Sequence, residues 1–136
     1  MTDAELRDSL AAARTIAVLG AHAHHNKAAF YVPDYLYRHG YRILPINPAF
    51  AGQTLWGQKV RANLREVLEP VDLLDVFRRS QALPLHLEEI LALRPKLVWL
   101  QSGIRHPAFA EKLEENGIAV VQDRCLMVVH GQLLGA

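Results

Sequence analysis

Five short, almost unbroken apolar runs recur along the chain and constrain its fold more than any other feature. They cover residues 15–19, 41–46, 71–77, 96–100 and 118–121. Runs of this length are typical of strands and are too short to cross a membrane as helices. Because strands that are buried on both faces are apolar throughout, the pattern predicts a parallel sheet with helices on both sides.

Helical segments alternate with these runs and provide the crossovers that parallel strands require. We expect helices over residues 2–13, 28–39, 80–93 and 106–117. Thr2 and Glu5 have the spacing of a capping box at the start of the first helix. Pro107 near the start of the last helix and Gly117 at its end match the usual placement of these residues at helix termini.

The remaining segments give weaker signals. The sequence predicts a looser stretch over 49–58, a short helix around 61–68 and one further short strand at 126–129. No internal repeat or second domain is indicated. Because right-handed crossovers join parallel strands, the fold class is α/β. It is a Rossmann-like doubly wound parallel sheet of about five strands, with helices on both faces and residues 1–136 in a single domain.

Composition and charge narrow the classes of function. The net charge is +1 and the Lys and Arg residues are scattered, which argues against nucleic acid as a partner. No long apolar run predicts a membrane segment, and the acidic start of the chain does not resemble a signal peptide. Cys125 is the only cysteine, so an internal disulfide and a cysteine-rich zinc site are both excluded. These features predict a cytoplasmic protein.

Ligands of doubly wound sheets bind beyond the carboxyl ends of the strands, where the strand order reverses. The loop after the first strand, residues 20–27, contains one glycine and leads into a helix, whose first amides favour a phosphate group. Lys27 and the Arg78–Arg79 pair supply positive charge for further phosphates. The loop lacks the G-x-G-x-x-G fingerprint, so by itself it does not identify the ligand.

The end of the second strand separates the nucleotide classes. NAD-binding domains place an acidic side chain there to hold the ribose hydroxyls. This chain has Pro45-Ile46-Asn47-Pro48 at that position, without a carboxylate. The absence argues against NAD and leaves NADP open. A phosphorylated adenosine held in another way fits the site better.

Several ordered stretches resemble the CoA-binding domain family, the small proteins that are similar to the N-terminal domain of the succinyl-CoA synthetase α-subunit. The matching stretches are residues 16–21, 40–48, 71–78, 98–104 and 123–127. Together they cover nearly the whole chain in the family's order, and the ordered set is specific although each stretch alone is not.

The resemblance implies coenzyme A as the ligand, lying across the strand ends. The residues that it assigns to the ligand are Gly20, Ala21, His22, Asn26, Lys27, Asn47, Pro48, Phe77, Arg78, Gln101, Ser102 and Gly103. The first loop would hold the phosphates, Asn47 and Pro48 would border the nucleotide, and Gln101 to Gly103 would follow the pantetheine. The first loop departs from the family: it has His24-His25-Asn26-Lys27 where a Pro and a Ser or Asn usually precede the basic residue.

Catalysis is not implied by the resemblance. The synthetase phosphorylates a histidine in a second domain and uses another subunit for the nucleotide, and a chain of this length has room for neither. We therefore expect a module that binds CoA or an acyl-CoA and serves as a carrier, a sensor or a subunit. The acyl group and any protein partner or homo-oligomer cannot be read from the sequence.

Two other classes of function stay open. One is an enzyme, either an NADP-linked reductase or a small acyl-CoA-processing protein that uses Cys125 or a histidine of the first loop. The other is an oligomeric scaffold whose pocket binds nothing. We predict no metal site at His22, His24 and His25, because no carboxylate or thiolate accompanies them.

Other chemically active residues also have structural interpretations. Asp72 and Asp75 are expected to support the sheet rather than to transfer protons. Ser102 lacks the sharp turn of a nucleophile elbow and is expected to donate a hydrogen bond in its loop. Trp56 and Trp99 are expected to pack in the interior.

Overall fold

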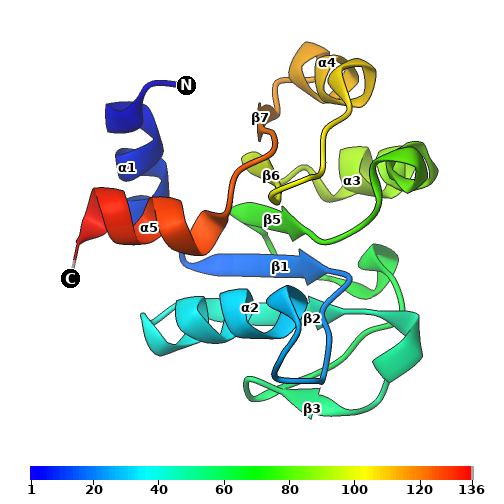
Figure 1. Cartoon of the computed structure of the whole chain (residues 1–136). Coiled ribbons are helices and arrows are strands. Elements are labelled where there is room, and N and C mark those ends of the chain that lie inside the picture. The colour runs from blue at the N-terminus through cyan, green and yellow to red at the C-terminus, as the bar shows by residue number, and fades with distance from the viewer. Residues whose placement is uncertain (136) are drawn as a thin grey trace.

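The computed structural model describes residues 1–135, and its centre is a five-stranded parallel sheet (Figure 1). The strands are β1 (Thr15–Leu19), β2 (Arg42–Ile46), β5 (Leu73–Val76), β6 (Leu97–Leu100) and β7 (Ala119–Val121). Their order across the sheet is β2-β1-β5-β6-β7, and every neighbouring pair is parallel. The predicted α/β, Rossmann-like sheet is confirmed, because all five apolar runs form its strands.

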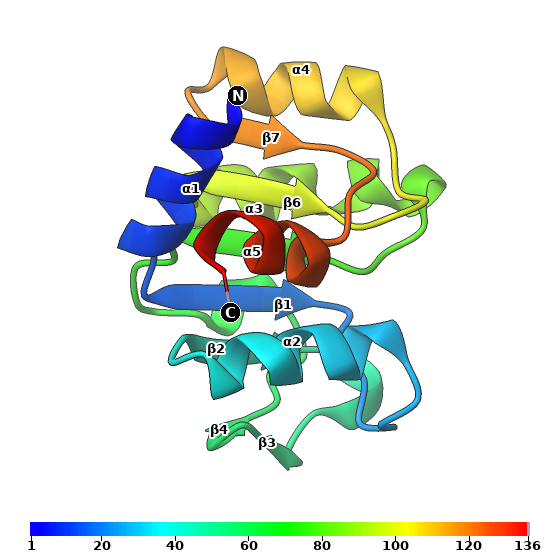
Figure 2. The same cartoon turned by 60° about the vertical axis from the view of Figure 1, so that its left-hand side comes forward.

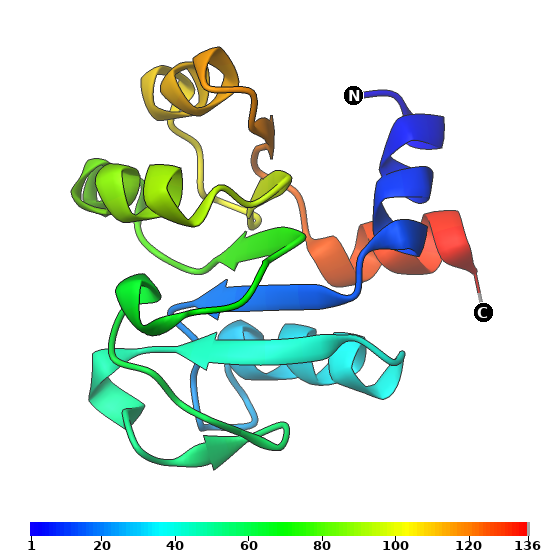
Figure 3. The same ribbon diagram turned by 180° about the vertical axis from the view of Figure 1, so that it is seen from behind.

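Helices cover both faces of the sheet, as predicted. The helices are α1 (Asp3–Ala12), α2 (Ala28–Arg38), α3 (Leu87–Leu93), α4 (Pro107–Glu115) and α5 (Leu126–Leu134). Figure 2 shows α1, α2 and α5 in front of the sheet, and Figure 3 shows α3 on the opposite side. Each face has its own cluster of buried side chains. Alternate residues of one strand contribute to opposite clusters: Leu74 and Val76 face α3 and α4, while Leu73 faces the other three helices.

The strand order reverses between β1 and β5. From β1 the chain crosses to β2 on one side, and it then returns to build β5, β6 and β7 on the other. The crossovers on either side of this point leave the sheet in opposite directions, so the loops beyond the carboxyl ends of β1 and β5 diverge there.

The last element differs from its prediction. Residues 126–129 were predicted as a short strand, but they begin helix α5. A short apolar run such as Leu-Met-Val-Val is compatible with either structure. Its buried residues Leu126, Val129 and His130 are three and four positions apart, which places them on one helical face against the sheet.

The segment between β5 and α3 also departs from its prediction. One helix was expected over 80–93, whereas residues Ser80–His86 form a 3-10 helix and only Leu87–Leu93 are α-helical. Pro84 lacks the N–H of a regular α-helical turn. The Ser80 hydroxyl accepts a hydrogen bond from the Arg105 amide at 3.0 Å instead of capping the helix.

The crossover from β2 to β5 contains only short elements. It has two 3-10 turns, Pro48–Phe50 and Leu64–Glu66, and a small hairpin made of β3 (Thr54–Leu55) and β4 (Gln58–Lys59). The short helix predicted around 61–68 is therefore a single turn, which Asn63 caps. Within residues 1–135, no helix is long and apolar enough to span a membrane.

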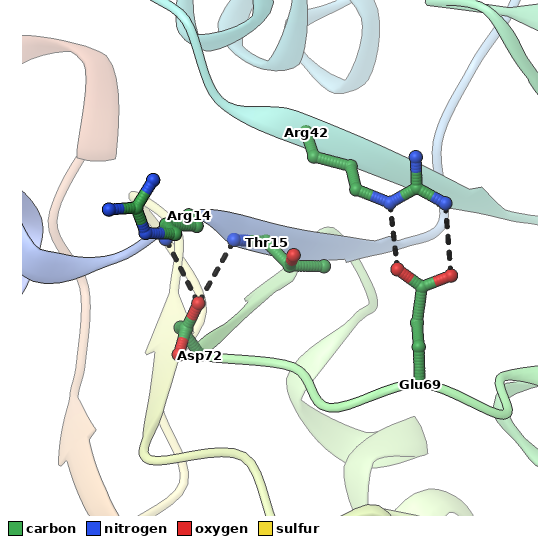
Figure 4. Close-up of polar contacts among 5 residues, drawn as sticks. All are labelled: Arg14, Thr15, Arg42, Glu69 and Asp72. Atoms are coloured by element: carbon green, nitrogen blue, oxygen red, sulfur yellow. Dashed lines mark hydrogen bonds and ion pairs between the residues drawn. The ribbon is translucent and has the colours of Figure 1, made fainter.

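Polar contacts fix the amino ends of the strands (Figure 4). Asp72 accepts hydrogen bonds from the amides of Arg14 and Thr15 at 2.9 and 3.0 Å and thereby ties the start of β1 to that of β5. Partial burial would raise the pKa of Asp72, but these amides and Lys96 outweigh that effect and hold it below its usual value. Nearby, Arg42 makes a two-pronged ion pair with Glu69 at 2.7 and 3.0 Å.

Candidate functional site

Gly20 joins two strand ends at the point where the strand order reverses. Its φ is +90°, and a Cβ at this position would lie 2.5 Å from the carbonyl oxygen of Phe77. Only glycine allows this backbone conformation together with so close an approach. The amides of Gly20 and Ala21 donate to the Ile46 carbonyl at 2.8 and 3.2 Å. The ends of β1, β2 and β5 are thereby held together.

Asn47 shapes the loop after β2 with both ends of its side chain. Its Nδ2 donates to the Ala21 carbonyl at 2.8 Å, and its Oδ1 accepts from the Ala49 amide at 2.9 Å. The side chain therefore links the first two loops. Pro48 begins a 3-10 turn and is exposed, so its ring is open to a ligand.

His22 is held in place within the first loop. Its Nδ1 accepts from the His24 amide at 3.0 Å, and its ring packs edge-on against His24 and Phe50, with centroids 4.6 and 4.7 Å away. Desolvation lowers the pKa of His22, and the charges of His24 and Lys27 lower it further. His22 is therefore a neutral, ordered aromatic side chain near neutral pH.

The end of the first loop is exposed and leads into α2. Asn26 and Lys27 are exposed, and Lys27 is the residue that precedes the helix. The Lys27 carbonyl accepts from the amides of Phe30 and Tyr31, which starts the first turn. Beside the loop, the ring of His25 stacks on Phe30 with centroids 4.2 Å apart.

Arg78, His86 and Glu89 form a connected polar group beyond the end of β5. Arg78 Nε donates to His86 Nε2 at 3.3 Å, and His86 Nδ1 lies 2.7 Å from Glu89 Oε1. A cavity of about 120 Å³ lies among these side chains, Gly20, Asn47, Pro48 and Asn63. Arg78 also lines an open groove of about 320 Å³, whose other residues are Phe77, Arg79, Ser102, Gly103 and Ile104.

Gln101 is buried beneath the end of β6. Its Nε2 donates to Asp75 Oδ1 at 2.6 Å, and its Oε1 accepts from the Leu126 amide at 3.3 Å. Because both ends of the side chain are engaged, Gln101 links β5, β6 and α5. Ser102 and Gly103 beyond it are exposed, and the Gly103 amide donates to Asp123 at 2.6 Å.

Larger hollows lie at the opposite end of the sheet, with volumes of about 350 and 550 Å³. Asp72 and Lys96 line both of them. The Asp72 carboxylate is already bound to two amides and to Lys96. We therefore place the site at the carboxyl edge, where the sheet topology and the cationic side chains coincide.

The sequence match that identifies the family covers the whole sheet and the segments that connect its strands. Residues 14–131 match the family described as CoA binding domain. The chain belongs to the CoA-binding domain family.

Several proteins are similar to this chain over nearly its whole length. A Thermus thermophilus protein, cell-free ID.343, is 59% identical and has a TM-score of 0.96, with 98% of this chain and 99% of that chain covered. A hypothetical protein from Pyrococcus horikoshii OT3 is 29% identical, with a TM-score of 0.92 and coverage of 99% and 94%. The uncharacterized protein YneT of Bacillus subtilis is 32% identical over 127 residues, which are 93% of each chain.

The candidate site also contains residues that were not predicted from the sequence. Phe50 packs on His22, while Asn63, His86 and Glu89 line the small cavity with Arg78. The only available signal was the position of Phe50 shortly after the second strand. Cys125 is half-buried and precedes α5. Within residues 1–135, no three His, Cys, Asp or Glu side chains gather to hold a metal ion.

Proposed function

We propose that this protein binds coenzyme A, or an acyl-CoA, across the carboxyl ends of β1, β2, β5 and β6. The observation that carries the proposal is the close contact of Gly20 with Phe77 in a chain of the CoA-binding domain family. This contact brings the first loop, residues 20–27, and Arg78 to the same edge of the sheet. The ligand's phosphates would meet loop amides and Lys27 on one side and Arg78 on the other.

The open groove supports the direction in which the ligand would run. The groove extends from Phe77 and Arg78 to Ser102 and Gly103, beyond the ends of β5 and β6. A pantetheine arm is an extended chain with amide groups, and exposed backbone and hydroxyl groups in this groove suit it. Gln101 would act from beneath, because its side chain is engaged with Asp75 and Leu126. The other assigned residues keep the roles that the family resemblance implies.

We further propose that the domain is similar to the N-terminal domain of the succinyl-CoA synthetase α-subunit in function as well as fold. It would present CoA to a partner and would not transform CoA by itself. The protein would then be a carrier of CoA, a sensor of CoA or a subunit of a larger enzyme. Its proposed location is the cytoplasm. Asn47 at the end of β2 supports CoA over NAD, since that position has no carboxylate for ribose hydroxyls.

Replacing Arg78 with alanine tests the site. A charged hydrogen bond to a phosphate contributes about 1.5–3 kcal/mol, so Arg78→Ala should weaken CoA binding by about 10–150-fold. Isothermal titration calorimetry of the two proteins measures this difference. Arg7→Ala, which removes an exposed arginine on α1, should leave CoA affinity unchanged. Equal CoA affinity for wild type and Arg78→Ala would remove Arg78 from the site.

A further inference from the structure

The side chain of Arg78 is held by a hydrogen bond to His86, a contact that the family match does not assign. Its Nε is bound to His86 Nε2 at 3.3 Å, and within residues 1–135 its two terminal nitrogens donate to no other group. These nitrogens are the part of a guanidinium that grips a phosphate in a two-pronged manner. Binding through Nε fixes the plane of the guanidinium and leaves the phosphate-binding end free.

Glu89 determines which ring nitrogen of His86 carries the hydrogen. A carboxylate only accepts hydrogen bonds, so the 2.7 Å contact requires the hydrogen on His86 Nδ1. With that hydrogen on Nδ1, His86 Nε2 has a lone pair that accepts from Arg78 Nε. The side chains of His86 and Glu89 are only 18% and 12% exposed, so packing holds both of them. Glu89 orients His86, and His86 in turn orients Arg78.

The small cavity next to Arg78 supplies the place for the bound group. Its volume of about 120 Å³ is enough for a phosphate group and too small for a nucleoside. Gly20, Asn63 and Arg78 line it together with His86 and Glu89. Because Arg78 also borders the open groove, a phosphate in this cavity would stay connected to a ligand that lies along the strand ends.

We propose that His86 and Glu89 are positioning residues that hold Arg78 for one phosphate group of the ligand, seated in the cavity between Gly20, Asn63 and Arg78. The inference rests on the proposed function and deepens it by naming the phosphate-binding unit. The group is a phosphate monoester or a diphosphate, and CoA contains both. His86 and Glu89 also line this cavity, but neither side chain has a hydrogen-bond donor left for the phosphate, so both act through Arg78.

A matched pair of substitutions separates the two contacts of His86. His86→Asn places an amide donor near the position of Nδ1 and keeps the contact with Glu89, but it removes the acceptor for Arg78. His86→Gln places an acceptor near the position of Nε2 and restores the contact with Arg78. We expect His86→Asn to weaken CoA binding at least about threefold, and His86→Gln to stay within about twofold of wild type.

The decisive readout is a double-mutant cycle measured by calorimetry with CoA and with dephospho-CoA. In the Arg78→Ala background, His86→Asn should cause less than about a twofold further loss, because its effect passes through Arg78. A loss confined to CoA assigns the 3′-phosphate, and an equal loss with both ligands assigns the diphosphate. Thermal unfolding of each variant confirms that it is folded.

Three results would overturn the inference while leaving the proposed function intact. They are unchanged binding by His86→Asn, an equal loss with His86→Gln, or effects of His86→Asn and Arg78→Ala that multiply in full. Failure of the wild-type protein to bind CoA would overturn the proposed function as well, so the two failures are distinguishable.

Discussion

Gly20→Ala is expected to reduce the free energy of unfolding by about 2–4 kcal/mol. The added Cβ meets the Phe77 carbonyl oxygen at 2.5 Å, and the residue must also keep a φ of +90°. The conformation alone costs about 1 kcal/mol, and relieving the clash by shifting the backbone costs about 1–3 kcal/mol more. Chemical denaturation measures the loss. CoA binding should fall with it, because the shift separates the two loops that would hold the ligand.

Gly40→Ala is the matched control for Gly20→Ala. Gly40 has a similar φ of +95°, but a Cβ there would meet no atom within 4 Å. The control therefore carries only the conformational cost, about 1 kcal/mol, and should bind CoA as wild type does. Equal destabilisation by the two substitutions would show that the contact with Phe77 does not constrain the site.

Asp75→Asn is expected to change how stability depends on pH. Asp75 is fully buried on β5, and within residues 1–135 its Oδ2 has no hydrogen-bond partner. Burial raises the pKa of Asp75 from 3.8 to about 7, although the hydrogen bond from Gln101 opposes the rise. In the unfolded chain Asp75 is ionised above about pH 4, whereas in the folded protein it keeps its proton to about pH 7.

The sign of the effect follows from proton uptake on folding. Between about pH 4 and pH 7 the folded state binds one proton more than the unfolded state at Asp75, so this group lowers the free energy of unfolding as pH rises. The loss reaches a plateau above about pH 8. The amide in the variant cannot titrate, so the difference in unfolding free energy should shift in favour of Asp75→Asn by on the order of 2–4 kcal/mol.

Subtracting the unfolding free energies of the two proteins isolates the contribution of Asp75 from groups whose contributions change with pH in the opposite direction. Burial and nearby His39 lower the pKa of His130, so its contribution is lost as pH falls and cancels in the difference. Urea denaturation of both proteins at several values from about pH 4 to pH 8 provides the measurement. A flat difference for Asp75→Asn would mean that Asp75 is ionised in the folded protein.

The sheet was predictable because its signal is local. Each strand is a short, buried apolar run that alternates with a helical segment, and all five were found within two residues of their bounds. Helix α5 was not predictable by the same reasoning, because Leu126 to Val129 is a strand-sized apolar run. His130 and Gly131 follow this run and interrupt the apolar pattern, so the sequence does not indicate that the helix continues to Leu134. What makes it a helix is packing against the sheet and the contact of the Leu126 amide with Gln101.

The edge that carries the candidate site was predictable, but its internal contacts were not. In a parallel sheet the loops after β1, β2, β5 and β6 must share one edge, which placed Gly20, Asn47 and Arg78 together. The partners of Arg78 depend on the 3-10 helix Ser80–His86, where a regular helix was predicted. The 3-10 geometry of this segment places His86 beside Arg78. The link between Gln101 and Asp75 depends in turn on the register of β5 with β6.

The most direct test of coenzyme A binding is calorimetric titration of the purified wild-type protein with CoA, with NADPH and ADP as comparators. We expect saturable binding of CoA that is clearly tighter than that of either comparator, since both loops and the groove would contribute contacts. Absence of CoA binding, or tighter binding of NADPH, would contradict CoA as the ligand and favour a reductase at the same edge of the sheet.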